Sequence, residues 1–92
     1  MCTSIVEIVA VEGAGKRGGD WFALTRAVVA YDHPHHALLE EAIAIDFVND
    51  TLGPSARTAV ELSLGSAKAL CRALASAIAA AEREEAARQR GA

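Results

Sequence analysis

The most constraining feature of the sequence is a change of hydrophobic pattern at Ser63. Before this residue, the apolar side chains form short β-branched or alternating segments, which are typical of strands. After it, apolar residues recur at intervals of three and four, which is typical of an amphipathic helix. The pattern predicts four strands followed by one long helix, a ββββα arrangement in the α+β class.

Four segments have strand character, and each is bounded by glycine, proline or polar residues. The predicted strands are 5–11, 21–31, 42–48 and 58–62. Consecutive strands with short connections usually pair as neighbours, so we expect a four-stranded antiparallel meander. A single long C-terminal helix with Ser63 as N-cap is expected to cover one face of this sheet. Residues 1–81 then form a single domain, and residues 82–92 form a polar helix extension or a frayed tail.

The register of the first hairpin decides what lies beside the loop after the second strand. A turn near Lys16 and Arg17 would place Glu7 opposite Arg26 as a cross-strand ion pair. The same register would bring Cys2 opposite Tyr31. We therefore expect the Cys2 thiol at the end of the sheet where the second strand stops.

The composition predicts a thin core. Hydrophobic residues make up 52% of the chain, but many of them are alanine, and only 4% of the residues are aromatic. Large apolar residues occur on both faces of the predicted strands, whereas one helix covers only one face. An uncovered apolar face usually marks an interface, so we expect a homo-oligomer, with a dimer as the first expectation.

Charge and local composition exclude several classes of protein. A net charge of −3 lacks the basic excess that nucleic-acid binding needs, so no nucleic-acid partner is expected. No uninterrupted apolar run approaches the roughly 20 residues of a membrane span, and the first residues do not resemble a secretory signal. Two cysteines do not form the disulfide framework of a small secreted domain. A cytoplasmic protein with no membrane association is expected.

The residues most suited to chemistry lie in one short stretch after the second predicted strand. All three histidines of the chain lie there, between one aspartate and two glutamates: Asp32, His33, His35, His36, Glu40 and Glu41. Imidazole and carboxylate groups are the usual ligands of zinc, iron and copper, and imidazole also transfers protons near neutral pH. The stretch is a candidate metal or proton-transfer site, although a short histidine tract is more often a merely exposed loop.

Two mechanisms fit a thiol beside this loop. In the first, Cys2, His33 and His36, helped by Glu40 or Asp32, bind a transition metal such as zinc, iron or copper with one open coordination position. In the second, removal of the initiator methionine makes Cys2 an N-terminal nucleophile, and its own α-amine or a histidine such as His33 acts as the base. The plain interpretation is that Cys2 is a small terminal residue and that the histidines belong to an exposed loop.

The sequence also resembles a family of short bacterial proteins classed as a domain of unknown function. The resemblance rests on the Met-Cys-Thr start, the Asp-His-Pro-x-His block, the Ile-Asp-Phe-Val-Asn block, Gly53-Pro54 and the Val-Glu-Leu-Ser segment. The first two are its most specific parts. They single out Cys2, His33 and His36 and leave His35 as a variable position. The resemblance implies no activity.

Two hypotheses follow for the function. The first is a small cytoplasmic oligomer with a metal-binding or thiol-based site formed by Cys2, His33 and His36, which would include a small enzyme acting on a small molecule. The second is a non-catalytic interaction or ligand-binding module that oligomerises through its uncovered sheet face. Both an enzyme and a binding module are compatible with these residues.

Overall fold

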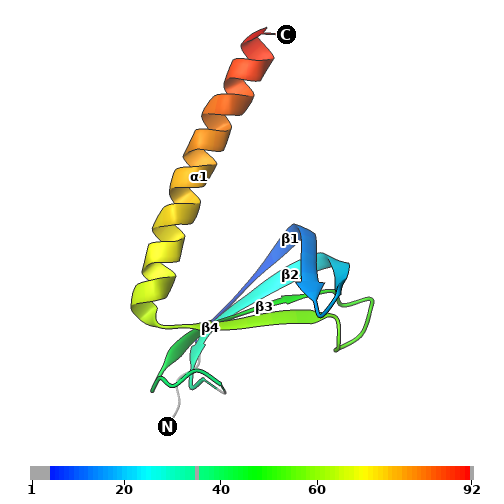
Figure 1. The fold of residues 1–92 in the computed structure, drawn as a ribbon, viewed down its shortest axis with the longest axis vertical. Helices are drawn as coiled ribbons and strands as arrows, with labels where there is room; N and C mark the ends of the chain where they lie inside the picture. The colour runs from blue at the N-terminus through cyan, green and yellow to red at the C-terminus, as the bar shows by residue number, and fades with distance from the viewer. Residues whose placement is uncertain (1–4, 35, 92) are drawn as a thin grey trace.

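The computed structural model describes residues 5–34 and 36–91, which form four strands and one helix (Figure 1). The elements are β1 (Ile5–Arg17), β2 (Asp20–Asp32), β3 (Ala42–Val48), β4 (Arg57–Leu62) and α1 (Leu64–Gly91). The strands form one sheet in the order β1-β2-β3-β4, and every neighbouring pair is antiparallel. The predicted ββββα class and the antiparallel meander are confirmed.

The strand register sorts the side chains onto two different faces. One, which we call the apolar face, carries large aliphatic and aromatic residues from all four strands: Ile5, Val9, Val29, Tyr31, Ile43, Ile45, Phe47, Val60 and Leu62. The opposite face, which we call the polar face, carries all the charged groups of β3 and β4 among small residues: Arg26, Ala30, Asp32, Ala44, Asp46, Arg57, Ala59 and Glu61. Four aliphatic residues, Val6, Ile8, Val28 and Val48, share this face. Paired residues of antiparallel strands share a face, so the register fixes this division.

The first hairpin is longer than the sequence pattern predicted, and its register is different. Its turn is the two-residue Gly18-Gly19 connection, in which Gly18 has a φ of 60°, as a type II′ turn requires at its first central position. Beyond a bulge between Ala10 and Gly13, Glu7 pairs with Val29. Tyr31 pairs with Ile5. The expected pairings of Glu7 with Arg26 and of Cys2 with Tyr31 are therefore wrong, because both the turn and the bulge shift the strands.

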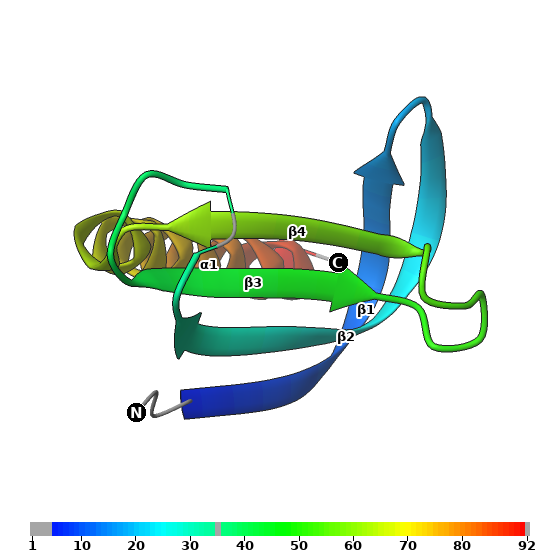
Figure 2. The ribbon, with the colours of Figure 1, turned by 90° about the horizontal axis from the view of Figure 1, so that it is seen from below.

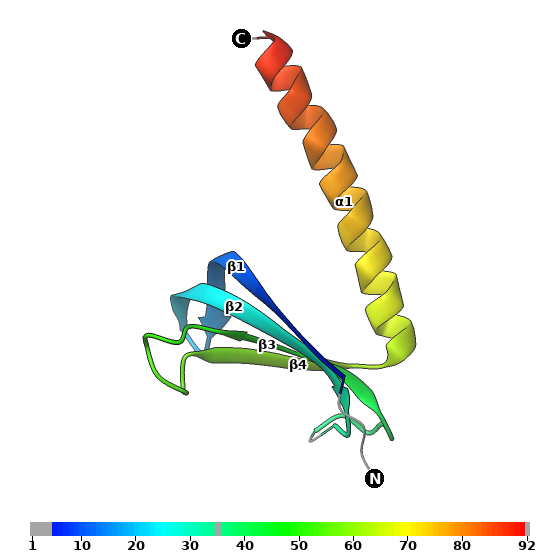
Figure 3. The same cartoon turned by 180° about the vertical axis from the view of Figure 1, so that it is seen from behind.

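The bulge lets the tip of the hairpin bend over the apolar face. Figures 1 and 3 show this tip rising on the same side of the sheet as α1. The Thr58 hydroxyl donates a hydrogen bond of 2.9 Å to the Lys16 carbonyl, which joins the bent tip to β4. Gly15 packs closely against Leu24: a Cβ atom added at Gly15 would lie 3.0 Å from the Cδ2 atom of Leu24. The hairpin tip and α1 thus bound the apolar face at opposite ends.

The helix α1 begins at the cap that the sequence predicted. The Ser66 backbone N–H donates to the Ser63 hydroxyl at 3.1 Å, and the Ala67 N–H donates to the Ser63 carbonyl at 2.9 Å. This is the N-cap arrangement, in which a side-chain oxygen satisfies an amide that has no partner inside the helix. The helix then continues without a break to Gly91, so the polar segment 82–91 is helical.

The helix leaves the sheet instead of lying along it. Figures 1 and 3 show α1 as an arm that rises from the end of β4, and none of its residues is buried. The expected cover of one sheet face is therefore limited to the first turns, where Leu64 and Ala67 approach Ile43 and Ile45. Among the described residues, α1 is also long and apolar enough to cross a membrane by length and composition alone.

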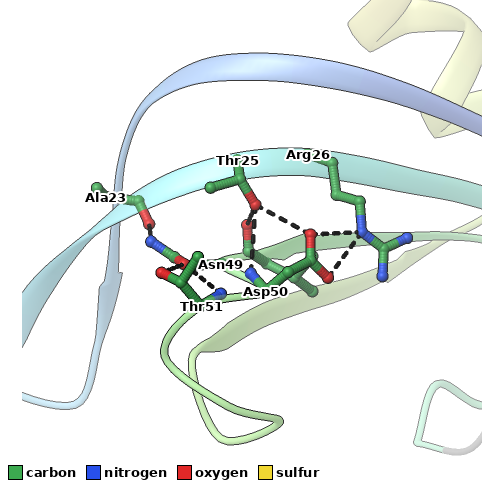
Figure 4. Close-up of polar contacts among 7 residues, drawn as sticks. Ala23, Thr25, Arg26, Asn49, Asp50 and Thr51 are labelled. Atoms are coloured by element: carbon green, nitrogen blue, oxygen red, sulfur yellow. Dashed lines mark hydrogen bonds and ion pairs between the residues drawn. The ribbon is translucent and has the colours of Figure 1, made fainter.

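The loop between β3 and β4 is tied to β2 by a cluster of polar contacts that combines the buried Asn49 with an exposed ion pair (Figure 4). The Asn49 side-chain amide donates to the Ala23 carbonyl at 2.9 Å, and its oxygen accepts from the backbone and hydroxyl of Thr51. Asn49 is only 6% exposed. Arg26 forms an ion pair with Asp50 at 2.9 Å, and Thr25 bonds to the same carboxylate. These contacts fix the turn that sends β4 back along β3, as Figure 2 shows from below.

The Asn49→Ala substitution should therefore destabilise the sheet. It leaves the Ala23 carbonyl and the Thr51 amide without their partner, a loss of about 2–3 kcal/mol in the free energy of unfolding. Urea denaturation monitored by circular dichroism measures the change. Ser55→Ala, in the exposed part of the same loop, is the control and should change the free energy by less than about 0.5 kcal/mol. Equal effects of both substitutions would contradict the anchoring role of Asn49.

Candidate functional site

The polar face holds an open groove of about 720 Å³ beside the histidine loop. We call it the polar groove. Its floor consists of Ala30, Ala44 and Ala59 from three adjacent strands, whose small side chains leave room above the sheet. Its walls carry polar groups from β2, β3, β4 and the loop: Asp32, His33, His36, Asp46, Arg57 and Glu61.

His33 lies at the start of the loop and is held by backbone and carboxylate oxygens. Its Nδ1 lies 3.1 Å from the Glu40 carbonyl and 3.3 Å from a Glu41 carboxylate oxygen, and its backbone N–H donates to Asp32. The hydrogen bond to the Glu40 carbonyl, followed by the charge of Glu41, raises the pKa of His33 above 6.5. The groove therefore contains an imidazole whose protonated form is favoured by the neighbouring oxygens.

The second half of the loop is fastened to β4 by Glu61. One oxygen of its carboxylate accepts the backbone N–H groups of His36, at 2.8 Å, and of Ala37, at 2.9 Å. A carboxylate that receives two amides forms strong charge-assisted hydrogen bonds. The bonds hold the histidine loop over the groove although Glu61 is 25 residues from His36 in the sequence.

The far side of the polar groove is closed by an ion pair between β3 and β4. Arg57 donates to the Asp46 carboxylate at 3.0 Å, and both side chains remain partly exposed. This pair also lines a neighbouring hollow of about 480 Å³ that contains Arg26 and Asp50. The sequence analysis did not identify Asp46, Arg57 or Glu61 as groove residues. The alternation of side chains along β3 shows that Asp46 lies on one face of the sheet. That Arg57 and Glu61 of β4 lie on the same face near Asp46 depends on the strand register, which the sequence pattern does not give.

The structure brings together some of the predicted site residues. His33 and His36 line the same groove, and Asp32 also belongs to its lining. Glu40 contacts His33 through its backbone oxygen. Within residues 5–34 and 36–91, no group of three histidine, cysteine or acidic side chains is arranged to hold a metal ion. Cys2 and His35 lie outside the described residues, so the sites that depend on Cys2 remain predictions.

The geometry defines a class of small α+β protein: an antiparallel meander with a polar groove on one face, an apolar opposite face and a projecting C-terminal helix. Comparison with protein families places residues 1–87 in the family of unknown function DUF6295, and the chain belongs to that family. This agrees with the resemblance to a domain of unknown function. Comparisons with curated proteins and with solved structures gave no significant match.

The raised pKa of His33 gives a testable pH dependence. Because the folded state favours the protonated imidazole, the contribution of His33 to stability is present below pH 6.5 and is lost as the pH rises through the raised value. Glu41→Gln removes one cause and should lower the pKa of His33, measured by NMR titration of the imidazole. Glu84→Gln on α1 is the control and should leave that pKa unchanged. An unchanged pKa in Glu41→Gln would contradict the ion pair.

Proposed function

We propose that the protein is a non-catalytic, self-associating binding module. Copies join through the apolar face and α1, and the polar groove on the opposite face stays open to a small polar ligand. The observation that carries this proposal is the amount of apolar surface that a single chain leaves exposed. Large residues of the apolar sheet face and of the helix, such as Ile5, Val9, Leu74 and Ile78, each expose more than half of their surface.

The surface area of one chain supports the need for a partner. A folded monomer of 9.6 kDa has an accessible surface of about 5,100 Å², whereas this chain has 7010 Å². The excess, about 1,900 Å², is in the range that each subunit buries in an obligate dimer. The radius of gyration is 16.1 Å, against about 12 Å for a compact domain of this length.

The interior of a single chain is too small to account for a stable fold. The buried apolar residues of the described chain are three alanines, Ala27, Ala42 and Ala56. Alanine contributes little transfer free energy on burial, so these residues supply only a small part of what ordering the chain costs. Burial of the apolar face against a second copy would supply the missing hydrophobic contribution.

The polar groove supports the binding part of the proposal. Its volume of about 720 Å³ is in the range of small-molecule sites, and charged groups of both signs surround an alanine floor. It lies on the face opposite α1, so assembly through the apolar face would leave it accessible. A ligand with both a cationic and an anionic group would meet complementary charges in Asp32, Arg57 and Glu61.

The state of association is the first test. Light scattering should show a dimer at micromolar concentration, and the thermal midpoint should rise with protein concentration because assembly stabilises the folded chain. Leu74→Asp places a charge in the exposed apolar row of α1 and should dissociate the dimer or unfold the chain. Ser76→Asp, on the outward side of the same helix, is the matched control and should behave like the wild type. A folded wild-type monomer would overturn the proposal.

The metal or thiol site remains a second candidate, favoured by the position of His33 and His36 in one groove. Elemental analysis of protein purified without a histidine tag would detect zinc, iron or copper. A metal site predicts about one equivalent in the wild type and a loss in Cys2→Ser and His33→Ala. A thiol site predicts that His33→Ala slows the reaction of Cys2 with a thiol reagent. Wild-type protein with neither property would exclude this candidate.

A further inference from the structure

We infer that the second copy lays its α1 antiparallel against the α1 of the first. The inference rests on the proposed function, because it specifies the partner and geometry of the self-association. It is carried by two properties of α1: the spacing of its apolar residues and the distribution of its charges along the helix.

The apolar residues of α1 follow the alternating three- and four-residue spacing of a coiled coil. Six successive positions at this spacing are Leu64, Ala67, Cys71, Leu74, Ile78 and Ala81. The exposed fractions of Leu64, Leu74 and Ile78 are 52%, 58% and 51%, so the row is open along its length. Three of the six positions, Ala67, Cys71 and Ala81, are small, which allows a second helix to approach closely. The row is therefore suited to another helix.

The same spacing continues into the polar end of the helix. The next two positions are Glu85 and Arg88, which would be core positions of a helix pair. In a parallel pair each residue meets its own copy, so two glutamates and two arginines would be forced together in the interface. A parallel pair is thus disfavoured by charge. An antiparallel pair moves these residues to the two ends and separates the like charges, because Glu85 then lies opposite the partner's Ala67 and Arg88 opposite the partner's Leu64.

Charge along α1 also favours the antiparallel arrangement. The first half carries Lys68 and Arg72, whereas residues 82–85 carry three glutamates and one arginine, ahead of the basic last turn with Arg88 and Arg90. A two-fold axis that crosses the helix pair at the level of Ser76 places Leu74 opposite the partner's Ile78. The same axis brings Lys68 near the partner's Glu82. Within one chain Lys68 and Glu82 are 14 residues apart, about 21 Å along the helix. Only a second chain can pair them.

An apolar crevice beside α1 is suited to the partner's helix. A crevice of about 360 Å³ separates the first turns of α1 from the sheet, and it is almost entirely apolar. Val29, Ile43 and Ile45 form its sheet side, and Leu70, Cys71 and Leu74 belong to its helix side. The antiparallel alignment brings the partner's Ile78 and Ala81 to this crevice. The second helix would therefore cover the apolar face that α1 leaves open in its own chain.

A cysteine crosslink tests the alignment directly. In a Cys2→Ser background, an antiparallel pair keeps the two copies of Cys71 about 15 Å apart along the axis, so native Cys71 should not crosslink. Adding Ala81→Cys should give a crosslinked dimer on oxidation, because position 81 faces the partner's Cys71. The control carries Cys2→Ser, Cys71→Ala and Ala81→Cys and should stay uncrosslinked.

A charge exchange provides the second test. Lys68→Glu or Glu82→Lys alone should raise the dimer dissociation constant about threefold to tenfold, because each creates two repulsive pairs per dimer. The double variant Lys68→Glu with Glu82→Lys should restore the wild-type value. An acidic residue near a helix N-terminus favours the helix, so weaker association of Lys68→Glu cannot be assigned to helix loss.

The outcomes separate this inference from the proposed function. A dimer that crosslinks through Cys71 alone, or one that the double variant fails to restore, overturns the antiparallel pairing and leaves self-association standing. A folded monomer by light scattering overturns both. Cosedimentation of such a monomer with vesicles of anionic phospholipid would identify a lipid surface as the occupant of the apolar row instead. A dimer with crosslinking only in the Ala81→Cys variant and with restored affinity supports the inference.

Discussion

The feature on which the whole structure depends is that α1 projects away from the sheet and leaves most of the apolar face uncovered. The meander places Val29, Ile43 and Ile45 on the side where α1 emerges, and the first turns of the helix border a crevice above these residues. The bent hairpin tip bounds the other end. Between them lies apolar surface that is exposed to water in the single chain, and burying it is the contribution that the proposed association would supply.

Much of the architecture could be predicted because it depends on local pattern. The third strand, Ala42–Val48, has the predicted bounds, and the Ser63 cap follows from one hydroxyl at the end of an alternating segment. The hairpin register could not be obtained in this way. It depends on the Gly18-Gly19 turn and on a bulge after Ala10, and neither changes the hydrophobic periodicity. The apolar row of α1 predicted that the helix needs a neighbour, but it did not distinguish the chain's own sheet from another chain.

The candidate site shows the same difference between features that follow from local sequence and features that depend on long-range pairing. His33 and His36 are close in the sequence, and they share the polar groove. Glu61, which fastens their loop, and the Asp46–Arg57 pair, which closes the groove, come from strands whose relative position depends on long-range pairing. The same holds for Arg26, whose partner is Asp50 in a distant loop instead of Glu7. Residue type and spacing therefore identify reactive side chains, whereas tertiary register decides which charges neutralise them.

The polar end of α1 gains a physical role in the antiparallel pairing. As an isolated segment, residues 82–90 are a solvated helix with no apolar side. Placed at core spacing, Glu85 and Arg88 disfavour the parallel pair by charge repulsion and cost little in the antiparallel pair. A helix that was apolar throughout would associate in either direction and would also partition into lipid. In the proposed dimer the charged end would thus give direction to an association for which the apolar row would supply the free energy, and both polar grooves would remain on the outer faces.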